Sequence, residues 1–213
     1  MNSSYDGPER QEGVELHHIH RDDKYGFADK TGKVVIPCQW EWAEPFSEGL
    51  AGVKDEDGKL GFIDKTGEVV IPCQWKGISF WGFREGLAMV QDKRDKWGFI
   101  DKTGEVVIPC QWELARPFSE GLARVMDEYW RWGFIDKTGG VVIPCQWKWI
   151  RDFSEGLAMV QDEDDKCGYI DKTGQVVIPY QWRDAWDFRE GLAKVQDVEG
   201  YWHKIDKTGK VVE

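Results

Sequence analysis

Short apolar runs alternate with turn residues along the whole chain, and the same order recurs about every 35 residues. Each unit reads aromatic-Gly-Phe-Ile, Asp-Lys-Thr-Gly, x-Val-Val-Ile-Pro, Cys-Gln-Trp, a variable linker, Phe-Ser-Glu-Gly and Leu-Ala-x-Val. The first glycine of the unit, or the residue in its place, stands at Gly26, Gly61, Gly98, Gly133, Gly168 and His203. A fixed period of this length is typical of a tandem-repeat architecture, so the repeat is the unit of the fold.

Three parts of each unit have the composition of short β-strands. The runs over residues 25–28, 34–36 and 50–53 are short and rich in aromatic and β-branched side chains, which favour strands over helices. No segment keeps an apolar period of 3.6 residues, so we expect essentially no helix. The sequence predicts an all-β protein of three short antiparallel strands per repeat.

The residues between these runs have the chemistry of turns. In Asp-Lys-Thr-Gly the aspartate can accept the backbone N–H two residues on, and the glycine supplies a positive φ, which predicts a type I turn with a G1 bulge. Proline has no N–H to donate, so each Ile-Pro step predicts a strand end or a bulge. The aspartates are Asp29, Asp64, Asp101, Asp136, Asp171 and Asp206, and the prolines are Pro37, Pro72, Pro109, Pro144 and Pro179.

One tryptophan in each unit follows a glutamine, at Trp40, Trp75, Trp112, Trp147 and Trp182. A single three-stranded unit is too small to bury such a ring, but a neighbouring unit can cover it. Burial of ~200 Å² of ring surface is worth roughly 5 kcal/mol before entropy is counted. We therefore expect the units to stack on one another.

The repeated motif resembles that of the bacterial WG (also called KWG) repeat family. The resemblance runs from Gly13 to Val212 and is clearest at residues 96–98 (Lys-Trp-Gly) and 131–133 (Arg-Trp-Gly). It implies a β-rich tandem-repeat protein that serves as an interaction module, with no agreed catalytic residues. The chain departs from the motif at Tyr25, Leu60 and Cys167, which replace the tryptophan, and at His203, which replaces the glycine.

The repeats define the domain organisation. We expect an N-terminal tail over residues 1–11 and one WG-type β-repeat domain over residues 12–213, with five full repeats and a terminal partial one. Residues 12–16 are similar to the start of the Leu-Ala-x-Val strand, so the chain opens with a third-type strand. The two ends either cap an open superhelical, solenoid-like array or pair into a closed propeller- or barrel-like ring. We favour the open array.

Charge and composition narrow the partners and the compartment. The formal net charge of -11 disfavours nucleic acid and anionic membrane surfaces as partners.

Residues 1–10 contain no apolar signal segment, and no run of 18 apolar residues occurs, which predicts a soluble, cytoplasmic protein. No glycine-rich phosphate loop, nucleophile elbow or paired-cysteine motif is present, so we expect no enzyme and no cofactor.

The cysteines and histidines are interpreted as structural. Cys38, Cys73, Cys110 and Cys145 occupy one equivalent position, and Cys167 replaces an aromatic residue, so all five are expected to pack as reduced thiols. Metal binding is the alternative for the histidines, because His18 and His20 share one strand face, with His17 and His203 as further candidates. The prediction remains that no metal is bound.

Residues that differ between repeats are free to recognise a partner. Two parts of the unit vary: the linker after Gln-Trp and the hairpin tip. Both contain aromatic and arginine residues, which are the usual anchors of protein interfaces. The candidate partner surface consists of Trp42, Trp81, Trp130, Trp149, Trp186, Arg116, Arg151 and Arg183. A purely structural role for these rings, covering gaps between units, is the alternative.

These observations predict a non-enzymatic binding or scaffolding protein that presents a protein-interaction surface. The alternative function is a carbohydrate-binding module that uses exposed tryptophans. The oligomeric state stays open.

Overall fold

The computed structural model describes residues 15–212, and every regular element among them is a β-strand. No helix capable of spanning a membrane occurs in this part of the chain. The 22 strands form six antiparallel sheets. In chain order these are β1 (Leu16–Arg21), β2 (Lys24–Asp29) and β3 (Val34–Trp40); β4 (Trp42–Ala43), β5 (Ala51–Lys54), β6 (Leu60–Ile63) and β7 (Val69–Trp75); β8 (Gly77–Ile78), β9 (Ala88–Gln91), β10 (Trp97–Ile100) and β11 (Val106–Trp112); β12 (Leu114–Ala115), β13 (Ala123–Met126), β14 (Trp132–Ile135) and β15 (Val141–Trp147); β16 (Trp149–Ile150), β17 (Ala158–Gln161), β18 (Cys167–Ile170) and β19 (Val176–Trp182); and β20 (Asp184–Ala185), β21 (Leu192–Gln196) and β22 (Trp202–Asp206).

The four complete sheets contain one more strand than the sequence predicts. The linker after Gln-Trp, expected to be irregular, forms a two-residue strand at the edge of the next sheet. In the second sheet it is anchored by the backbone N–H groups of Glu41 and Glu44, which donate to the carbonyls of Lys54 and Gly52 at 2.9 Å each. A two-residue strand is too short to show an alternating pattern, which explains why the sequence does not reveal it.

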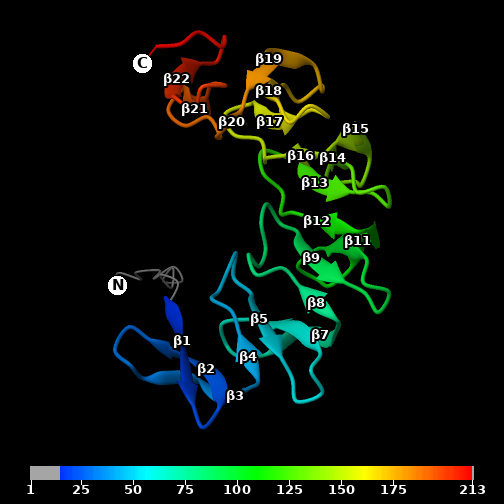
Figure 1. Cartoon of the computed structure of the whole chain (residues 1–213). Helices are drawn as coiled ribbons and strands as arrows, with labels where there is room; N and C mark the ends of the chain where they lie inside the picture. Colours follow the sequence, from blue (N-terminus) through cyan, green and yellow to red (C-terminus); the bar gives the residue numbers. More distant parts are fainter. Residues whose placement is uncertain (1–14, 213) are drawn as a thin grey trace, which may run out of the picture.

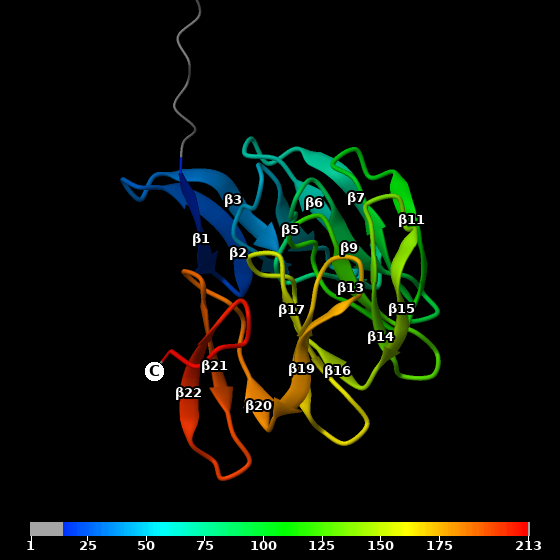
Figure 2. The ribbon, with the colours of Figure 1, turned by 90° about the horizontal axis from the view of Figure 1, so that it is seen from above.

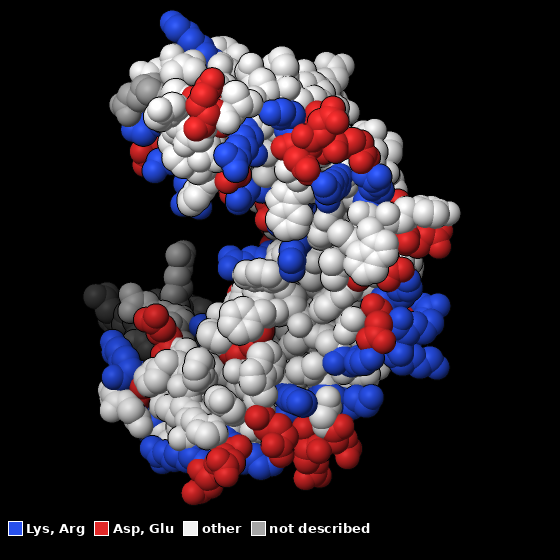
Figure 3. Space-filling model, viewed as in Figure 1, with Lys and Arg blue, Asp and Glu red and all other residues white. Residues whose placement is uncertain are grey.

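The six sheets follow one another around a curved path, with β1 at one end and β22 at the other (Figures 1 and 2). Within residues 15–212, no sheet combines strands from the two ends. The surface is hollowed between the first and last sheets (Figure 3). The expected open array is therefore confirmed, and the closed ring is not formed.

The predicted turns are present at all six Asp-Lys-Thr-Gly positions. At the first, Asp29 Oδ1 accepts the Thr31 backbone N–H at 2.8 Å, and Gly32 has a φ of 84°. The Ser-Glu-Gly turn is tighter than expected, because the glutamate also adopts a positive φ, 49° at Glu48. Both central residues of that turn therefore have the left-handed conformation of a type I′ hairpin.

The Ile-Pro step lies at a bulge, as predicted. In the fourth sheet Phe134 pairs with Ile143 while Trp132 pairs with Trp147, so two extra residues are inserted opposite Gly133. A Cβ at Gly133 would lie 2.5 Å from the Ile143 carbonyl oxygen. The glycine of the Trp-Gly motif is thus required by the close approach of the neighbouring strand.

The hydrophobic cores lie between consecutive sheets, not within them. The aromatic residue of each Gly-Phe-Ile strand contacts the phenylalanine of the following sheet's Phe-Ser-Glu-Gly segment, with ring centroids 4.6–5.0 Å apart in the pairs Phe27–Phe46, Phe62–Phe83, Phe99–Phe118, Phe134–Phe153 and Tyr169–Phe188. Four Gln-Trp rings are buried and Trp75 is half-buried. Trp147 shares its cluster with Ile150 and Val160 of the next sheet, so neighbouring sheets do cover these rings.

Polar contacts between sheets also repeat. The carboxylate of Glu120, in the fourth sheet, accepts the backbone N–H groups of Glu155 (2.5 Å) and Gly156 (3.0 Å) in the fifth. Lys172 of the fifth sheet pairs with the same carboxylate at 3.1 Å. Glu120 thus connects its own turn with two turns of the fifth sheet.

The first strand has the predicted type, in a shifted register. β1 pairs with β2 as β5 pairs with β6, but Leu16 lies opposite Asp29 and so occupies the place of Leu50, two residues later than the sequence pattern predicts. The expected tail over residues 1–11, and Glu12 to Val14 of the predicted strand, lie outside the described residues.

Candidate functional site: an arginine–tryptophan groove

The variable linkers converge on one groove. After β8, β12, β16 and β20 the chain enters a short segment whose side chains differ between sheets, and segments of four consecutive sheets line a cavity of about 530 Å³. We refer to this cavity as the arginine–tryptophan groove. Its lining consists of Trp81, Arg84, Arg116, Pro117, Phe118, Ser119, Arg124, Trp132, Trp149, Arg151, Asp152 and Asp187.

Arg124 is the most firmly held residue of the groove. Its Nε and Nη2 donate to Asp152 Oδ1 and Oδ2 at 2.5 and 3.2 Å, and its Nη1 donates to the Ile150 carbonyl at 2.6 Å. The guanidinium also lies 5.6 Å from the centroid of the Trp132 ring. A two-point arginine–carboxylate bond fixes both orientation and charge, so Arg124 joins the fourth sheet to the fifth.

Arg116 is positioned by an aromatic ring. Its guanidinium lies 5.5 Å from the centroid of the Trp81 ring, across the boundary between the third and fourth sheets. A cation over an indole face is attracted by the negative face of the ring, which orients the guanidinium while leaving its edge donors available. Arg84, at the position of Ser47, Ser119 and Ser154, adds an exposed cation beside the half-buried Arg116.

The groove contains two buried polar atoms that lack a hydrogen bond. Among the described residues, Arg151 Nε has no acceptor and Asp187 Oδ1 has no donor. Burial raises the pKa of Asp187, while the charge of Arg151 acts in the opposite direction. An unsatisfied buried donor or acceptor costs ~1–3 kcal/mol, so a group that bonds to both would be bound favourably.

Four predicted surface residues, Trp81, Trp149, Arg116 and Arg151, line this groove. Arg183 lies beside it, in a shallow depression of about 410 Å³ that shares Trp149 and Arg151. The other three predicted residues are elsewhere: Trp42 is half-buried in β4, Trp130 is at a hairpin tip with 66% of its surface exposed, and Trp186 is in the sixth sheet.

Sequence reasoning missed several lining residues. Arg124 occupies the x position of Leu-Ala-x-Val, where the second, third and fifth sheets carry Gly52, Met89 and Met159, and this departure from an uncharged residue is the available signal. Trp132 belongs to the repeated Trp-Gly motif, and a position shared between repeats does not by itself indicate a binding role. Asp152 and Asp187 carry no signal of their own, because acidic residues are frequent throughout the chain.

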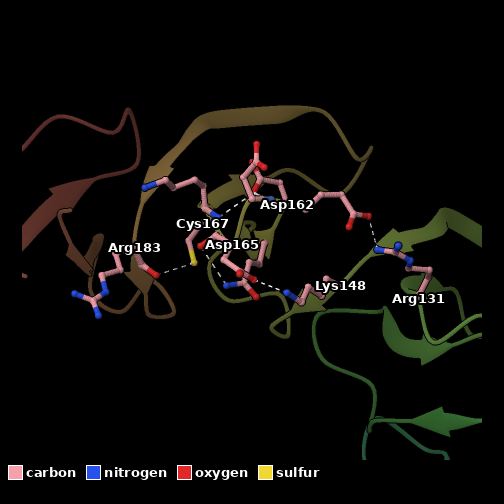
Figure 4. Close-up of polar contacts among 10 residues, drawn as sticks. Arg131, Lys148, Asp162, Asp165, Cys167 and Arg183 are labelled. Atoms are coloured by element: carbon pink, nitrogen blue, oxygen red, sulfur yellow. Dashed lines mark hydrogen bonds and ion pairs between the residues drawn. The ribbon is translucent and has the colours of Figure 1, made fainter.

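The carboxylates at the acidic hairpin tips form contacts with nearby residues. Asp162 Oδ1 accepts the backbone N–H groups of Asp164 (3.0 Å) and Lys166 (2.8 Å). The Lys148 ammonium forms an ion pair with Asp165 at 2.6 Å. Arg131, which belongs to the preceding sheet, forms an ion pair with Glu163 at 2.5 Å (Figure 4). Most carboxylates of this tip therefore serve local structure.

The cysteines occupy packing positions. All five are free thiols, and Cys73, Cys110 and Cys145 pack against the cores that contain the Gln-Trp ring of the preceding sheet. Burial raises the pKa of Cys73, Cys145 and Cys167 to about 11, which disfavours the reactive thiolate.

The histidines are divided between the two ends of the array. His18 and His20 flank the Tyr25 ring at 6.3 and 4.5 Å. His203 Nε2 lies 2.6 Å from Asp197 Oδ2 in the sixth sheet. Among residues 15–212, no group of three or more His, Cys, Asp or Glu side chains is arranged to hold a metal ion.

The geometry defines a class of protein: an open array of small antiparallel sheets, arranged like the blades of a propeller, that builds a composite groove from successive repeats. A family model described as WG containing repeat matches residues 25–59, 61–97, 97–128, 132–167 and 168–202. The chain therefore belongs to the WG-repeat family.

Solved structures share the fold at low sequence identity. The computationally designed Ika8 protein is similar with a TM-score of 0.52 and 11% identity, over 95% of this chain and 72% of the designed chain. BamB from Moraxella catarrhalis is similar with a TM-score of 0.51 and 13% identity, over 95% of this chain and 73% of its own. No curated protein matches the sequence significantly.

Proposed function

We propose that this protein is a non-catalytic binding protein whose arginine–tryptophan groove receives a segment of a partner protein. The observation that carries the proposal is convergence: side chains at positions that differ between repeats come together from four consecutive sheets. Exposed Trp81 and Trp149 provide aromatic anchors, and Arg84 and Arg116 provide cations beside them.

The groove has a charge opposite to that of the whole chain. Four arginines and two aspartates line it, whereas the protein has a formal net charge of -11. A partner segment with aromatic and acidic side chains would be complementary to it, and nucleic acid would be repelled by the remaining surface. All five cysteines are free thiols, which supports a reducing, cytoplasmic setting for this function.

The test is partner capture with matched variants of the intact protein. Trp81→Ala combined with Trp149→Ala, and separately Arg116→Ala, should reduce capture tenfold or more. Trp130→Ala removes a still more exposed ring outside the groove and should leave capture unchanged. Equal capture by the groove variants and the native protein would rule out the groove as the binding surface.

Glycan binding is the second candidate, and one observation favours it. Trp186 and Trp202, both about half-exposed, meet edge to face at 6.2 Å and an interplanar angle of 90° in a pocket of the sixth sheet. Exposed indole faces of this kind can stack on the apolar C–H face of a sugar ring.

A further inference from the structure

The sixth sheet differs from the others on its outer face. In the first five sheets, the aromatic residue of the Gly-Phe-Ile strand is fully buried against the following sheet. In the sixth sheet Lys204 takes that position, and it lies opposite Lys194 in the β21–β22 pair. The face that carries buried aromatic contacts elsewhere thus carries two lysines here.

Two tryptophans complete a pocket on this face. The pocket, of about 490 Å³, is lined by Trp186, Lys194, Trp202, His203 and Lys204, and we call it the terminal pocket. The perpendicular Trp186 and Trp202 rings form two adjacent apolar walls. His203 is held by its contact with Asp197, which fixes the floor beside Trp202.

His203 is tolerated where the other sheets require glycine. In the first five sheets the bulge of the neighbouring strand comes within 2.8 Å of the position of a Cβ at that glycine. β22 has no such strand in the described chain, since its only further pairing there is the bridge between Ile205 and Val211. The space taken by the bulge elsewhere is available to the imidazole.

The fourth sheet shows what a cation at this register position does. Arg124 and Trp132 occupy the places that Lys194 and Trp202 occupy in the sixth sheet. There the guanidinium lies above the indole and binds the Asp152 carboxylate contributed by the fifth sheet. Among the described residues no carboxylate contacts Lys194 as Asp152 contacts Arg124, so the ammonium of Lys194 can pair with an external carboxylate at the equivalent place.

We propose that the terminal pocket binds a hexuronate, a sugar ring that bears a carboxylate. The carboxylate pairs with the Lys194 ammonium, as Asp152 pairs with Arg124. The C–H face of the pyranose stacks on one indole, and the other indole closes the edge of the ring. This inference rests on the second candidate function, glycan binding, and is independent of the arginine–tryptophan groove.

The same observations disfavour a second copy of the chain as the occupant. Stacking of another sheet would need an aromatic partner for its phenylalanine, as in the five inter-sheet ring pairs. Lys204 stands in that place and would have to be desolvated. A small, soluble, charged ring avoids both costs.

The experiment is titration of the intact protein with galacturonate and glucuronate, followed by tryptophan fluorescence and calorimetry. Galactose, glucose and acetate are titrated in parallel. We expect saturable binding of a hexuronate at least tenfold tighter than that of its neutral sugar or of acetate. Lys194→Met, which installs the residue found at this position in the third and fifth sheets, should remove that preference.

Two further variants separate the ring contact from the charge contact. Trp202→Ala should abolish binding of charged and neutral sugars alike, and Trp130→Ala should change neither. Equal affinity for hexuronate and neutral sugar, or an unaltered preference in Lys194→Met, would overturn the hexuronate assignment while leaving glycan binding intact. Absence of binding by every sugar would overturn both, and acetate binding as tightly as hexuronate would overturn the sugar assignment.

Discussion

The indole Nε1 of Trp147 donates a hydrogen bond to the phenolic oxygen of Tyr180, 3.1 Å away in the next sheet. In the earlier sheets the residue at the position of Tyr180 is a cysteine. The indole nitrogens of Trp40, Trp75 and Trp112 are accordingly buried without a partner among the described residues. One inter-sheet contact therefore distinguishes the boundary between the fourth and fifth sheets from the three before it.

This difference predicts opposite effects of two substitutions. Tyr180→Phe should lower the free energy of unfolding by ~1–2 kcal/mol, because it leaves the Trp147 N–H buried and unpaired. Cys145→Tyr should raise it by ~1 kcal/mol, because the new hydroxyl can accept from Trp112. Urea unfolding of the intact protein measures both. A Tyr180→Phe variant as stable as the native protein would show that the bond contributes nothing.

The close approach at the bulge predicts a severe effect of a single methyl group. Gly133→Ala places a Cβ 2.5 Å from a backbone oxygen that cannot move without breaking the strand pair, so we expect a loss of more than ~3 kcal/mol. Gly156→Ala is the matched control: Gly156 has a φ of 85° but no atom within 4 Å of a Cβ. Its loss should be about 1 kcal/mol, from backbone strain alone. Thermal unfolding distinguishes the two variants.

Acid should destabilise the array through its repeated turns. A hydrogen bond from the threonine two residues on lowers the pKa of Asp29, Asp64, Asp101, Asp136, Asp171 and Asp206 below the usual 3.8. A carboxyl with a lower pKa in the folded state stabilises above its unfolded pKa, and this stability is lost as the pH falls through the folded value. The free energy of unfolding should therefore drop below about pH 4. Asp136→Asn should reduce that dependence, as measured by urea unfolding between pH 2 and 6.

Glu44 predicts a dependence of the opposite sign. Its carboxyl is buried with no hydrogen bond to either oxygen among the described residues, and burial raises its pKa from 4.5 to about 7. Ionisation then costs stability as the pH rises from 4.5 to 7, by up to ~3 kcal/mol at higher pH. Glu44→Gln should be more stable than the native protein at pH 8 and similar to it at pH 4. A native protein whose stability between pH 4.5 and 7 equals that of the variant would contradict the buried, unpaired state of Glu44.

The turns, the bulges and the stacking of repeats are predictable because each depends on residues close together in sequence. Asp29 and Gly32 encode a hairpin whatever surrounds them, and the burial of Trp40 follows from the small size of one unit. The fourth strand of each sheet is not predictable in this way. Trp42 and Ala43 form a strand only because the next sheet offers the Lys54 and Gly52 carbonyls.

The residues of the candidate site are likewise only partly predictable from the sequence. The variable linkers identify Trp81, Trp149, Arg116 and Arg151 as groove residues, but not which of the other variable tryptophans accompany them. Trp186 also follows a Gln-Trp motif and is about as exposed as Trp149, yet it stands at the linker position of Arg151 and lines the terminal pocket. The pairing of Arg124 with Asp152 likewise depends on the stacking of one sheet on another, which sequence spacing does not specify.

The central claim is that consecutive sheets form each core jointly, so that no sheet folds by itself. The most direct measurement compares the intact protein with an excised peptide of residues 114–147, which contains β12–β15, by amide NMR spectra and thermal unfolding. We expect dispersed resonances and a cooperative transition for the intact protein, and neither for the peptide. A dispersed spectrum and cooperative melting of the isolated peptide in dilute buffer would contradict the account.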